Sequence, residues 1–220
     1  MIKKEIFTFL TDLVANNERD WFQENKQRYE EAKQNVEDFA NAVLEEIRKT
    51  DKTIPEDLIG KKCVMRIYRD VRFSKNKLPY KNNISFWISS RGKGGDGPGY
   101  YVHIQPGKSF IAGGYWMPQA DHLKAIRQEI DYNTDDFLKI TQSKEFTNYF
   151  GSLDDGEKLK NHPKGYEATH PHIELLKLKS FTVTHSLSDK ELANSGAVNK
   201  VVEGLKIINP FVSFLNQAIL

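Results

Sequence analysis

The sequence predicts an α+β fold, in which an antiparallel meander sheet occupies the middle of the chain and helices flank it on both sides. Apolar residues recur at helical spacing towards both ends of the chain. Between residues 61 and 117 the period shortens to two, and β-branched and aromatic residues become frequent. A chain of 220 residues with 39% hydrophobic residues can bury a real core, and it contains no repeat or linker, so we expect a single domain over residues 1–220.

Two apolar stripes predict the N-terminal helices. Five apolar residues at helical spacing predict a short amphipathic helix over residues 6–14. A second helix is expected to begin at Asp20, with Gln23 completing a capping box, and to run to about Lys49. Its stripe repeats in seven-residue steps at Phe22, Tyr29, Val36 and Val43.

Alternation of side chains predicts strands near residues 62–73, 84–91, 100–105 and 109–116. The segment GKGGDGPG at residues 92–99 and the turn at residues 106–108 are typical of hairpin connections. The first of these is not a phosphate-binding loop, because a strand follows it and no Lys-Ser/Thr pair occurs there. Adjacent glycines at Gly113 and Gly114 indicate a bulge, a close backbone approach or packing against a helix.

Helical patterns return after Pro118 and continue with two apolar faces to about residue 150. A polar loop then precedes a short helix started by Pro171 and a last strand at residues 180–187. From Ser188 we expect a capped pair of helices. Together these elements give one α+β domain.

The segment RIYRDVRFSKNKLPYK, residues 66–81, concentrates positive charge in a chain that has 32 basic and 30 acidic residues. Six cations accompany the single acid Asp70: Arg66, Arg69, Arg72, Lys75, Lys77 and Lys81. One acid cannot neutralise three arginines, and guanidinium groups suit carboxylate and phosphate. We therefore expect a pocket for a small phosphate- or carboxylate-bearing ligand in this segment.

On the expected strand, Arg66, Asp70 and Arg72 share one face, so Asp70 would orient the arginines. Arg69 falls in the apolar row and needs an acceptor or a place at the sheet edge. The ligand-binding set continues on the following loop with Lys77 and the hydroxyl of Tyr80. Lys75 and Lys81 would add positive field at the rim.

Eight residues of this segment fit the pattern R-x-x-R-D-x-R-F-x-x-D/N-K-x-x-Y: Arg66, Arg69, Asp70, Arg72, Phe73, Asn76, Lys77 and Tyr80. The pattern resembles the signature of a bacterial family, domain-of-unknown-function family 2461. The resemblance covers nearly the whole chain, from NNERDWFQENKQRY through GYYVHIQPGKSFIAGGYW and HPKGY to the C-terminal helices. It implies a single-domain protein of this length, and it implies no activity, substrate or cofactor.

Two other interpretations of the basic segment stay open. In the first, the same cations bind nucleic-acid phosphates while nearby aromatic residues stack on bases, although a net charge of +2 gives the whole chain little attraction to nucleic acid. In the second, the charges form a structural brace and the protein works by binding a partner protein. The sequence does not decide whether the protein is an enzyme, and it does not predict an oligomeric state.

His103 is the candidate for proton transfer, together with Asp70 as the second candidate catalytic residue. Alternation places His103 on the polar side of its strand with Tyr101 and Gln105, where it would act as an acid or base or serve as a hydrogen-bonded structural residue. The HPH segment at residues 170–172, with His162 and His185, lacks the companions of a recognisable ligand set, so we expect no metal. No dinucleotide fingerprint occurs, and we expect no cofactor.

The single cysteine, Cys63, excludes an intrachain disulfide and favours a reducing compartment, so we expect a cytoplasmic protein. No apolar run approaches the ~18 residues of a membrane-spanning segment, and we expect no membrane partner. A small anionic ligand is the expected partner, and nucleic acid is the alternative.

Overall fold

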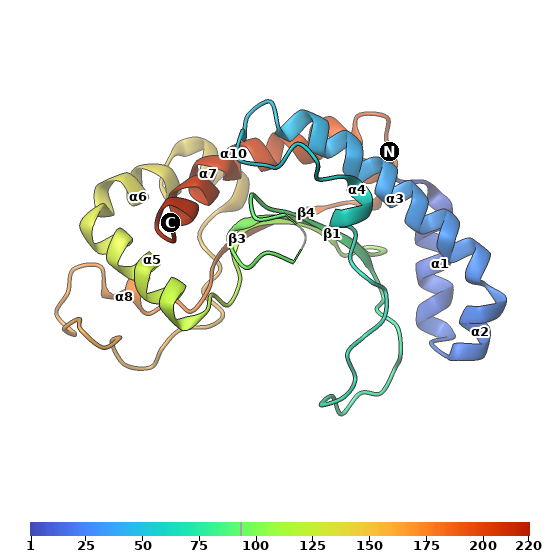
Figure 1. Cartoon of the computed structure of the whole chain (residues 1–220), viewed down its shortest axis with the longest axis horizontal. Coiled ribbons are helices and arrows are strands. Elements are labelled where there is room, and N and C mark those ends of the chain that lie inside the picture. Colours follow the sequence, from blue (N-terminus) through green and yellow to red (C-terminus); the bar gives the residue numbers. More distant parts are fainter. Residues whose placement is uncertain (93) are drawn as a thin grey trace.

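A four-stranded antiparallel sheet lies at the centre of the computed structural model, which describes residues 1–92 and 94–220 (Figure 1). The sheet order follows the chain: β1 (Ile84–Ile88), β2 (Gly99–Ile104), β3 (Ser109–Tyr115) and β4 (Phe181–Leu187). All three neighbouring pairs are antiparallel, so the predicted α+β class with a central meander is confirmed. Lys93, within the predicted glycine-rich connection, lies outside the described residues.

Helices cover one face of this sheet. Along β2, Tyr100, Val102 and Ile104 are buried and alternate with half-buried residues. The long helices α3 (Lys26–Ile47) and α10 (Ala197–Gln217) lie over the buried side (Figure 1). A Cβ atom at Gly113 would lie 2.3 Å from Cγ2 of Ile208 on α10, so the glycine lets the helix approach the sheet. Helix packing is therefore the explanation for this glycine.

The expected second helix is divided in two. α1 (Lys4–Ala15) is confirmed, whereas α2 (Arg19–Glu24) ends before Asn25 and α3 begins after it. Asp20 lies in the first turn of α2, and Glu18 occupies the N-cap position without a side-chain hydrogen bond, so the predicted capping box is wrong. The side chain of Asn25 donates to the carbonyl of Trp21 at 2.9 Å, which caps the end of α2 instead.

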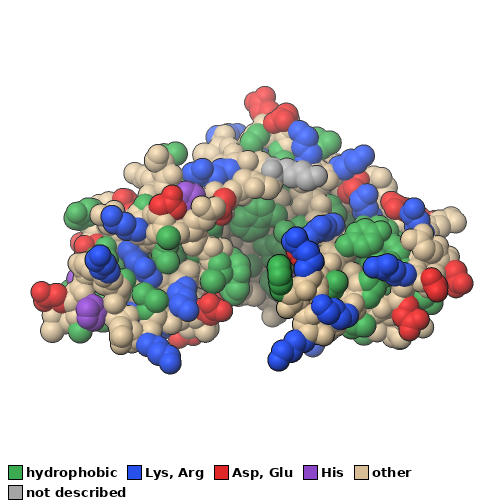
Figure 2. Space-filling view, turned by 60° about the horizontal axis from the view of Figure 1, so that its bottom comes forward, with side chains coloured by type: hydrophobic (Ala, Val, Ile, Leu, Met, Phe, Trp, Pro, Cys, Tyr) green, Lys and Arg blue, Asp and Glu red, His purple; other side chains and the backbone are tan. Residues whose placement is uncertain are grey.

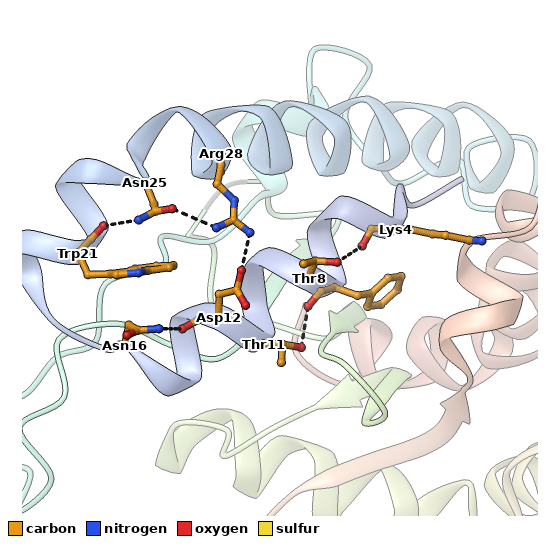
Figure 3. Close-up of polar contacts among 9 residues, drawn as sticks. Lys4, Thr8, Thr11, Asp12, Asn16, Trp21, Asn25 and Arg28 are labelled. Atoms are coloured by element: carbon orange, nitrogen blue, oxygen red, sulfur yellow. Dashed lines mark hydrogen bonds and ion pairs between the residues drawn. The ribbon is translucent and has the colours of Figure 1, made fainter.

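A side-chain network fixes these three helices to one another (Figure 3). Arg28 on α3 donates to Asp12 on α1 at 2.7 Å and to Asn25 at 3.0 Å. The side chain of Asn16 donates to the carbonyl of Asp12 and so caps the C-terminal end of α1. This N-terminal unit lies at one end of the sheet, next to the segment that carries most of the predicted site (Figure 1).

The prediction of a strand at residues 62–73 is wrong. The helical turn α4 (Gly60–Cys63) is followed by a long loop, which we define as the basic loop, residues 64–83. It meets the sheet at an isolated bridge between Val64 and Phe86, and a second bridge between Tyr68 and Tyr80 joins its two arms. Its dense positive charge disfavours a regular ladder, because like charges on neighbouring strands repel. Side-chain contacts fix the loop instead, and it extends beyond the sheet (Figure 1).

The second half of the chain follows the prediction more closely. After β3 come α5 (Ala120–Tyr132), α6 (Thr134–Thr141), α7 (Lys144–Phe150) and the short α8 (Ile173–Leu176), which starts two residues after Pro171. Between β4 and α10 lies α9 (Asp189–Leu192), and the capped start predicted at Ser188 is confirmed. There Ser188 Oγ accepts from the backbone of Glu191 at 3.2 Å, and the carboxylate of Glu191 accepts from the backbone of Ser188 at 2.8 Å.

One hydrophobic cluster connects these elements and extends from Ile2 to Leu215. A single domain over residues 1–220 stays a prediction. In the described part of the chain, no helix combines the length and the apolar composition that crossing a bilayer requires.

Candidate functional site

A large open cleft lies on the face of the sheet that α3 and α10 leave uncovered. Its volume is about 1580 Å³, larger than most small-molecule pockets. Trp87, Tyr101, Phe110 and Ala112 belong to its floor, and all four are half-buried. Figure 2 shows this hollow from its open side, with hydrophobic side chains inside it and basic side chains around it. The cleft therefore combines an apolar floor with a charged rim.

Strand register explains why these side chains form one surface. Trp87 pairs with Tyr101, Tyr101 with Ala112, and Ala112 with Thr184. Paired residues point to the same face of a sheet, so these four side chains form a row across all four strands. Small Ala112 leaves room in the row between larger side chains on either side.

One wall of the cleft is positively charged, and we call it the basic wall: Lys61, Lys62, Arg66 and Lys81. Lys62 is paired with Asp57 at 2.9 Å. Within residues 1–92 and 94–220, neither Arg66 nor Lys81 has a carboxylate within 4.0 Å. Lys81 is half-buried, and burial first and the nearby charge of Arg66 second lower the pKa of its ammonium group. Two like charges thus remain close together without an internal acid.

Most of the predicted basic segment fixes the loop itself. Arg69 donates to the carbonyl of Leu78 at 3.2 Å, and Lys77 donates to the carbonyl of Val71 at 2.9 Å. These contacts satisfy the expectation that Arg69 finds an acceptor, but they direct both side chains into the loop. Neither residue lines the cleft.

The remaining charged residues of the loop are exposed. Asp70 accepts two hydrogen bonds from the Arg72 guanidinium, at 3.0 and 2.7 Å, and this contact lowers the pKa of Asp70. Lys75 is exposed and lies two residues along the chain from Phe73, which is 96% exposed. Asp70 and Arg72 do not line the cleft, and an orienting role for Asp70 stays a prediction.

Tyr80 lies in the core rather than at the site surface. It is 3% exposed, and its ring stacks on Phe22 of α2 with centroids 4.0 Å apart. The side chain of Asn17 accepts from the backbone N–H of Tyr80 and donates to its carbonyl, both at 3.1 Å. Tyr80 therefore anchors one arm of the basic loop to the N-terminal helices, directly before Lys81.

His103 lies on the same sheet face as the cleft floor, one row from Tyr101. Its Nδ1 atom is 3.1 Å from the hydroxyl of Tyr101, and its Nε2 atom is 2.9 Å from Oε1 of Gln105. The ring also stacks on Phe110 with centroids 4.6 Å apart. Burial, the main cause, and the charge of Lys81 lower the pKa of His103, against the raising effect of Gln105, so the neutral ring prevails at neutral pH.

Three cleft residues that the sequence reasoning missed form a second polar group, which we call the acceptor corner: Asp154, Thr182 and Thr184. Both threonine hydroxyls donate to Oδ2 of Asp154, at 2.8 and 3.1 Å. Alternation in FTVTHSL could have placed the two threonines on one face, but nothing in the sequence signals that Asp154 joins them.

A further polar cluster lies where β3 ends. The hydroxyl of Tyr115 lies 2.7 Å from both the carboxylate of Asp96 and Nδ1 of His122. Burial, followed by Asp96, raises the pKa of Tyr115 well above its usual range. Glu37 on α3 is buried, and its carboxylate is 3.6 Å from the ammonium group of Lys33. Asp96 and Glu37 also line the cleft, and each has an internal partner.

Two of the histidines that could have been metal ligands have internal partners of their own. His170 contacts Asp131 at 2.8 Å, and His185 contacts the carbonyl of Tyr149 at 2.7 Å. Across the described chain, no three His, Cys, Asp or Glu side chains converge as metal ligands would. The expectations of no metal and no cofactor stay predictions.

No curated protein and no solved structure matches this chain. One protein-family model does match it, over residues 5–214, and that family is described as "Conserved hypothetical protein (DUF2461)". The match spans the N-terminal helices, the basic loop, the whole sheet and nearly all of α10. The chain therefore belongs to this family of conserved hypothetical proteins, as the resemblance of residues 66–80 had indicated.

Proposed function

We propose that the protein binds a small organic phosphate or carboxylate in the cleft on the open sheet face. Its anionic group would lie between Arg66 and Lys81, and its apolar or planar part would rest on Trp87, Tyr101 and Phe110. The two cations would bind the anion in different ways. The guanidinium of Arg66 would donate two hydrogen bonds in a fixed geometry, whereas the ammonium group of Lys81 would act as a point charge. Aromatic rings supply a large apolar contact area.

The observation that carries this proposal is the unneutralised pair Arg66 and Lys81. Arg66 is exposed and Lys81 is half-buried, and burial first and the charge of Arg66 second lower the pKa of Lys81. An anion bound between them would offset the repulsion and favour the protonated form of Lys81. Such an arrangement is common where a protein binds its ligand through charge.

The other residues of the predicted site take supporting roles in this proposal. Arg69, Asp70, Arg72, Lys77 and Tyr80 would shape the basic loop, and Lys75 would contribute positive field from outside the cleft. A catalytic role for His103 requires one ring nitrogen to exchange its internal partner for the ligand. Its present contacts favour a positioning role, in which His103 holds the hydroxyl of Tyr101. A cytoplasmic location is part of the proposal, supported by the free thiol of Cys63.

A thermal-shift screen tests the proposal directly. Purified protein is heated with phosphorylated metabolites, nucleotides and dicarboxylates, and the same panel is repeated with Lys81→Gln and Arg66→Gln. A ligand at about 100 times its Kd adds about 2.7 kcal/mol to the free energy of unfolding. We expect hits in the wild type that both variants lose and that Lys108→Gln, an exposed control in the turn after β2, retains. Hits that persist in both cleft variants would refute the proposal.

Nucleic-acid binding is the second candidate, and the tip of the basic loop favours it. Phe73 is almost fully exposed, and the Arg72 guanidinium lies 5.9 Å from the centre of its ring. An exposed aromatic ring among cations can stack on a base while the cations contact phosphates. Fluorescence anisotropy with a labelled single-stranded oligonucleotide would then show binding that weakens steeply with salt and that Phe73→Ala reduces. Unchanged binding in Phe73→Ala would reject this candidate.

The third candidate is a structural brace in a protein that binds another protein. The internal contacts of Arg69 and Lys77 favour it for the basic loop, but they do not explain the pair Arg66 and Lys81. In that case Arg66→Gln would lower the melting temperature, and no compound in the screen would raise it.

A further inference from the structure

The acceptor corner gives the cleft a second, chemically opposite binding end. Each threonine hydroxyl of Thr182 and Thr184 uses its single proton in a hydrogen bond to Oδ2 of Asp154. What these residues can still offer a ligand is therefore only acceptor capacity: Oδ1 of Asp154 and the hydroxyl lone pairs. Such a group requires hydrogen-bond donors from the ligand.

Asp154 also lacks an internal cation. Within residues 1–92 and 94–220, no lysine, arginine or histidine nitrogen lies within 4.0 Å of its carboxylate. Its neighbour Asp155, in contrast, is paired with Lys158 at 3.3 Å and lies outside the cleft lining. The cleft thus has an unpaired carboxylate at one end and an unpaired pair of cations at the other.

Strand geometry sets the separation of these two ends. The backbone N–H of Asp154 donates to the carbonyl of Thr182, which fixes the acceptor corner at the β4 edge. The basic wall lies at the β1 edge, where the backbone N–H of Met65 donates to the carbonyl of Ser85. Three strand spacings separate the two edges, a distance of about 14 Å. The row from Trp87 to Thr184 crosses the sheet between them.

We propose that the cleft binds an elongated zwitterion, with its phosphate or carboxylate at the basic wall, its middle along the Trp87–Thr184 row and an ammonium group at Asp154. This inference rests on the proposed function for the anionic end and adds the chemistry of the other end. The volume of about 1580 Å³ accommodates a ligand of this length. An ammonium group supplies three donors and a compensating charge, which match the acceptor corner.

Asp96 and Glu37 are the competing acids in the cleft. Glu37 is buried and lies 3.6 Å from the ammonium group of Lys33. The carboxylate of Asp96 already accepts the hydroxyl of Tyr115 at 2.7 Å, and Tyr115 is a buried residue at the end of β3. Both Asp96 and Asp154 accept hydroxyl groups, but Asp154 lies beside Thr184, which ends the row that crosses the cleft floor, whereas Asp96 lies in the connection between β1 and β2. The ammonium group is therefore assigned to Asp154.

Straight-chain ω-aminoalkyl phosphates of increasing length test the assignment, each compared with the alkyl and ω-hydroxyalkyl phosphates of equal length by calorimetry. At the length that spans the cleft, we expect the amino compound to bind about tenfold more tightly than the alkyl compound, as for a charge-assisted hydrogen bond. Asp154→Asn keeps the acceptor but removes the charge, so it should abolish that preference. Asp96→Asn and Asp155→Asn should keep it.

The possible results separate the two proposals. If alkyl phosphates bind and Lys81→Gln abolishes this binding, the anionic end is supported on its own. If alkyl phosphates do not bind, the proposed function is overturned. Equal binding of amino and alkyl compounds, or a preference that survives Asp154→Asn, overturns the zwitterion. A preference lost only in Asp96→Asn also overturns it, as does a preference for the hydroxyl compound. Absence of binding by every compound overturns both proposals.

Discussion

Arg66 and Lys81 lie on the same wall of the cleft, and the charge of Arg66 contributes to the lowered pKa of Lys81. The two residues are fifteen positions apart in the sequence and lie near the two ends of the basic loop. There the backbone N–H of Lys81 donates to the carbonyl of Ile67 at 2.8 Å. The fold of the loop therefore brings the two residues together, and a change of charge at one of them should alter the electrostatic environment of the other.

Replacing Arg66 by Gln should raise the pKa of Lys81, because one repulsive charge is removed. A side-chain NMR titration of the lysine εCH₂ group measures this pKa. Arg72→Gln is the control, since the Arg72 guanidinium is paired with Asp70 and lies away from the cleft. An unchanged Lys81 titration in Arg66→Gln would contradict the proposed coupling.

Anion binding in the cleft should weaken with rising pH, and it should do so at a lower pH than for a site whose lysine has the ordinary pKa. Lys81 loses its proton below the usual lysine pKa of 10.5, because its folded-state pKa is lowered. The affinity should therefore fall as the pH rises through that lowered value. Calorimetry across alkaline pH with a hit from the screen measures the effect, and the fall in affinity should coincide with the titration of Lys81 measured by NMR.

His103 should remain neutral at pH 7 and should destabilise the fold in acid. Its folded-state pKa lies below 6.5, mainly because of burial. Between that lowered value and 6.5 the unfolded chain binds more protons than the folded chain, so the free energy of unfolding falls as the pH decreases through this window. Histidine NMR should give a midpoint below 6.5, and His103→Gln should flatten the pH dependence of urea unfolding.

Asn17→Ala should lower the free energy of unfolding by about 1–3 kcal/mol, because it leaves a buried N–H and a buried carbonyl without partners. Both belong to Tyr80, and Asn17 is itself only 9% exposed. Urea denaturation measures the loss. Asn16→Ala is the neighbouring control, since the exposed Asn16 side chain contacts only the carbonyl of Asp12. Equal losses in the two variants would reject a special role for Asn17.

Gly113→Ala should lower the free energy of unfolding by about 1–3 kcal/mol through overpacking. The new methyl group would meet Ile208, a β-branched residue with little freedom to move. In an Ile208→Ala background the loss caused by Gly113→Ala should be smaller, and this double-mutant cycle distinguishes a clash with α10 from a backbone effect. Gly156→Ala, at an exposed position with open space, should change stability by no more than about 0.5 kcal/mol.

Regular elements were predictable where one periodic pattern determined both local structure and burial. The alternation in YVHI and the capping pair Ser188 and Glu191 are of this kind, and the structure has both. Residues 62–73 alternate equally well but form no strand in the structure, which describes all of them. Their positions depend on residues far away in the sequence, because Tyr68 packs near Phe22 of α2 and bridges to Tyr80, which Asn17 holds. A local pattern contains no information about such contacts.

The candidate site was predictable in its charge but not in its geometry. The sequence pointed to the segment that supplies Arg66 and Lys81, yet it placed Lys81 only at the rim of the pocket. It placed Arg69 and Lys77 in the pocket, and their acceptors are carbonyls within the same loop. The opposite end of the cleft depends on the pairing of β3 with β4, across more than 60 residues of intervening chain. Only the assembled sheet brings Asp154 and Thr184 to the same cleft as Lys81.

The stacking of Phe22 on Tyr80 has an evolutionary consequence. A substitution in α2 that loosens this contact would displace the adjacent Lys81 without touching the sheet, so the two parts of the chain are not free to diverge independently. Among relatives that keep the tyrosine at position 80, we expect the residues at positions 17 and 22 to stay compatible with it, even where the residues on the cleft floor differ. Ligand preference could then change by substitutions on the cleft floor, while the contact of Phe22 with Tyr80 that supports the basic wall stays the same.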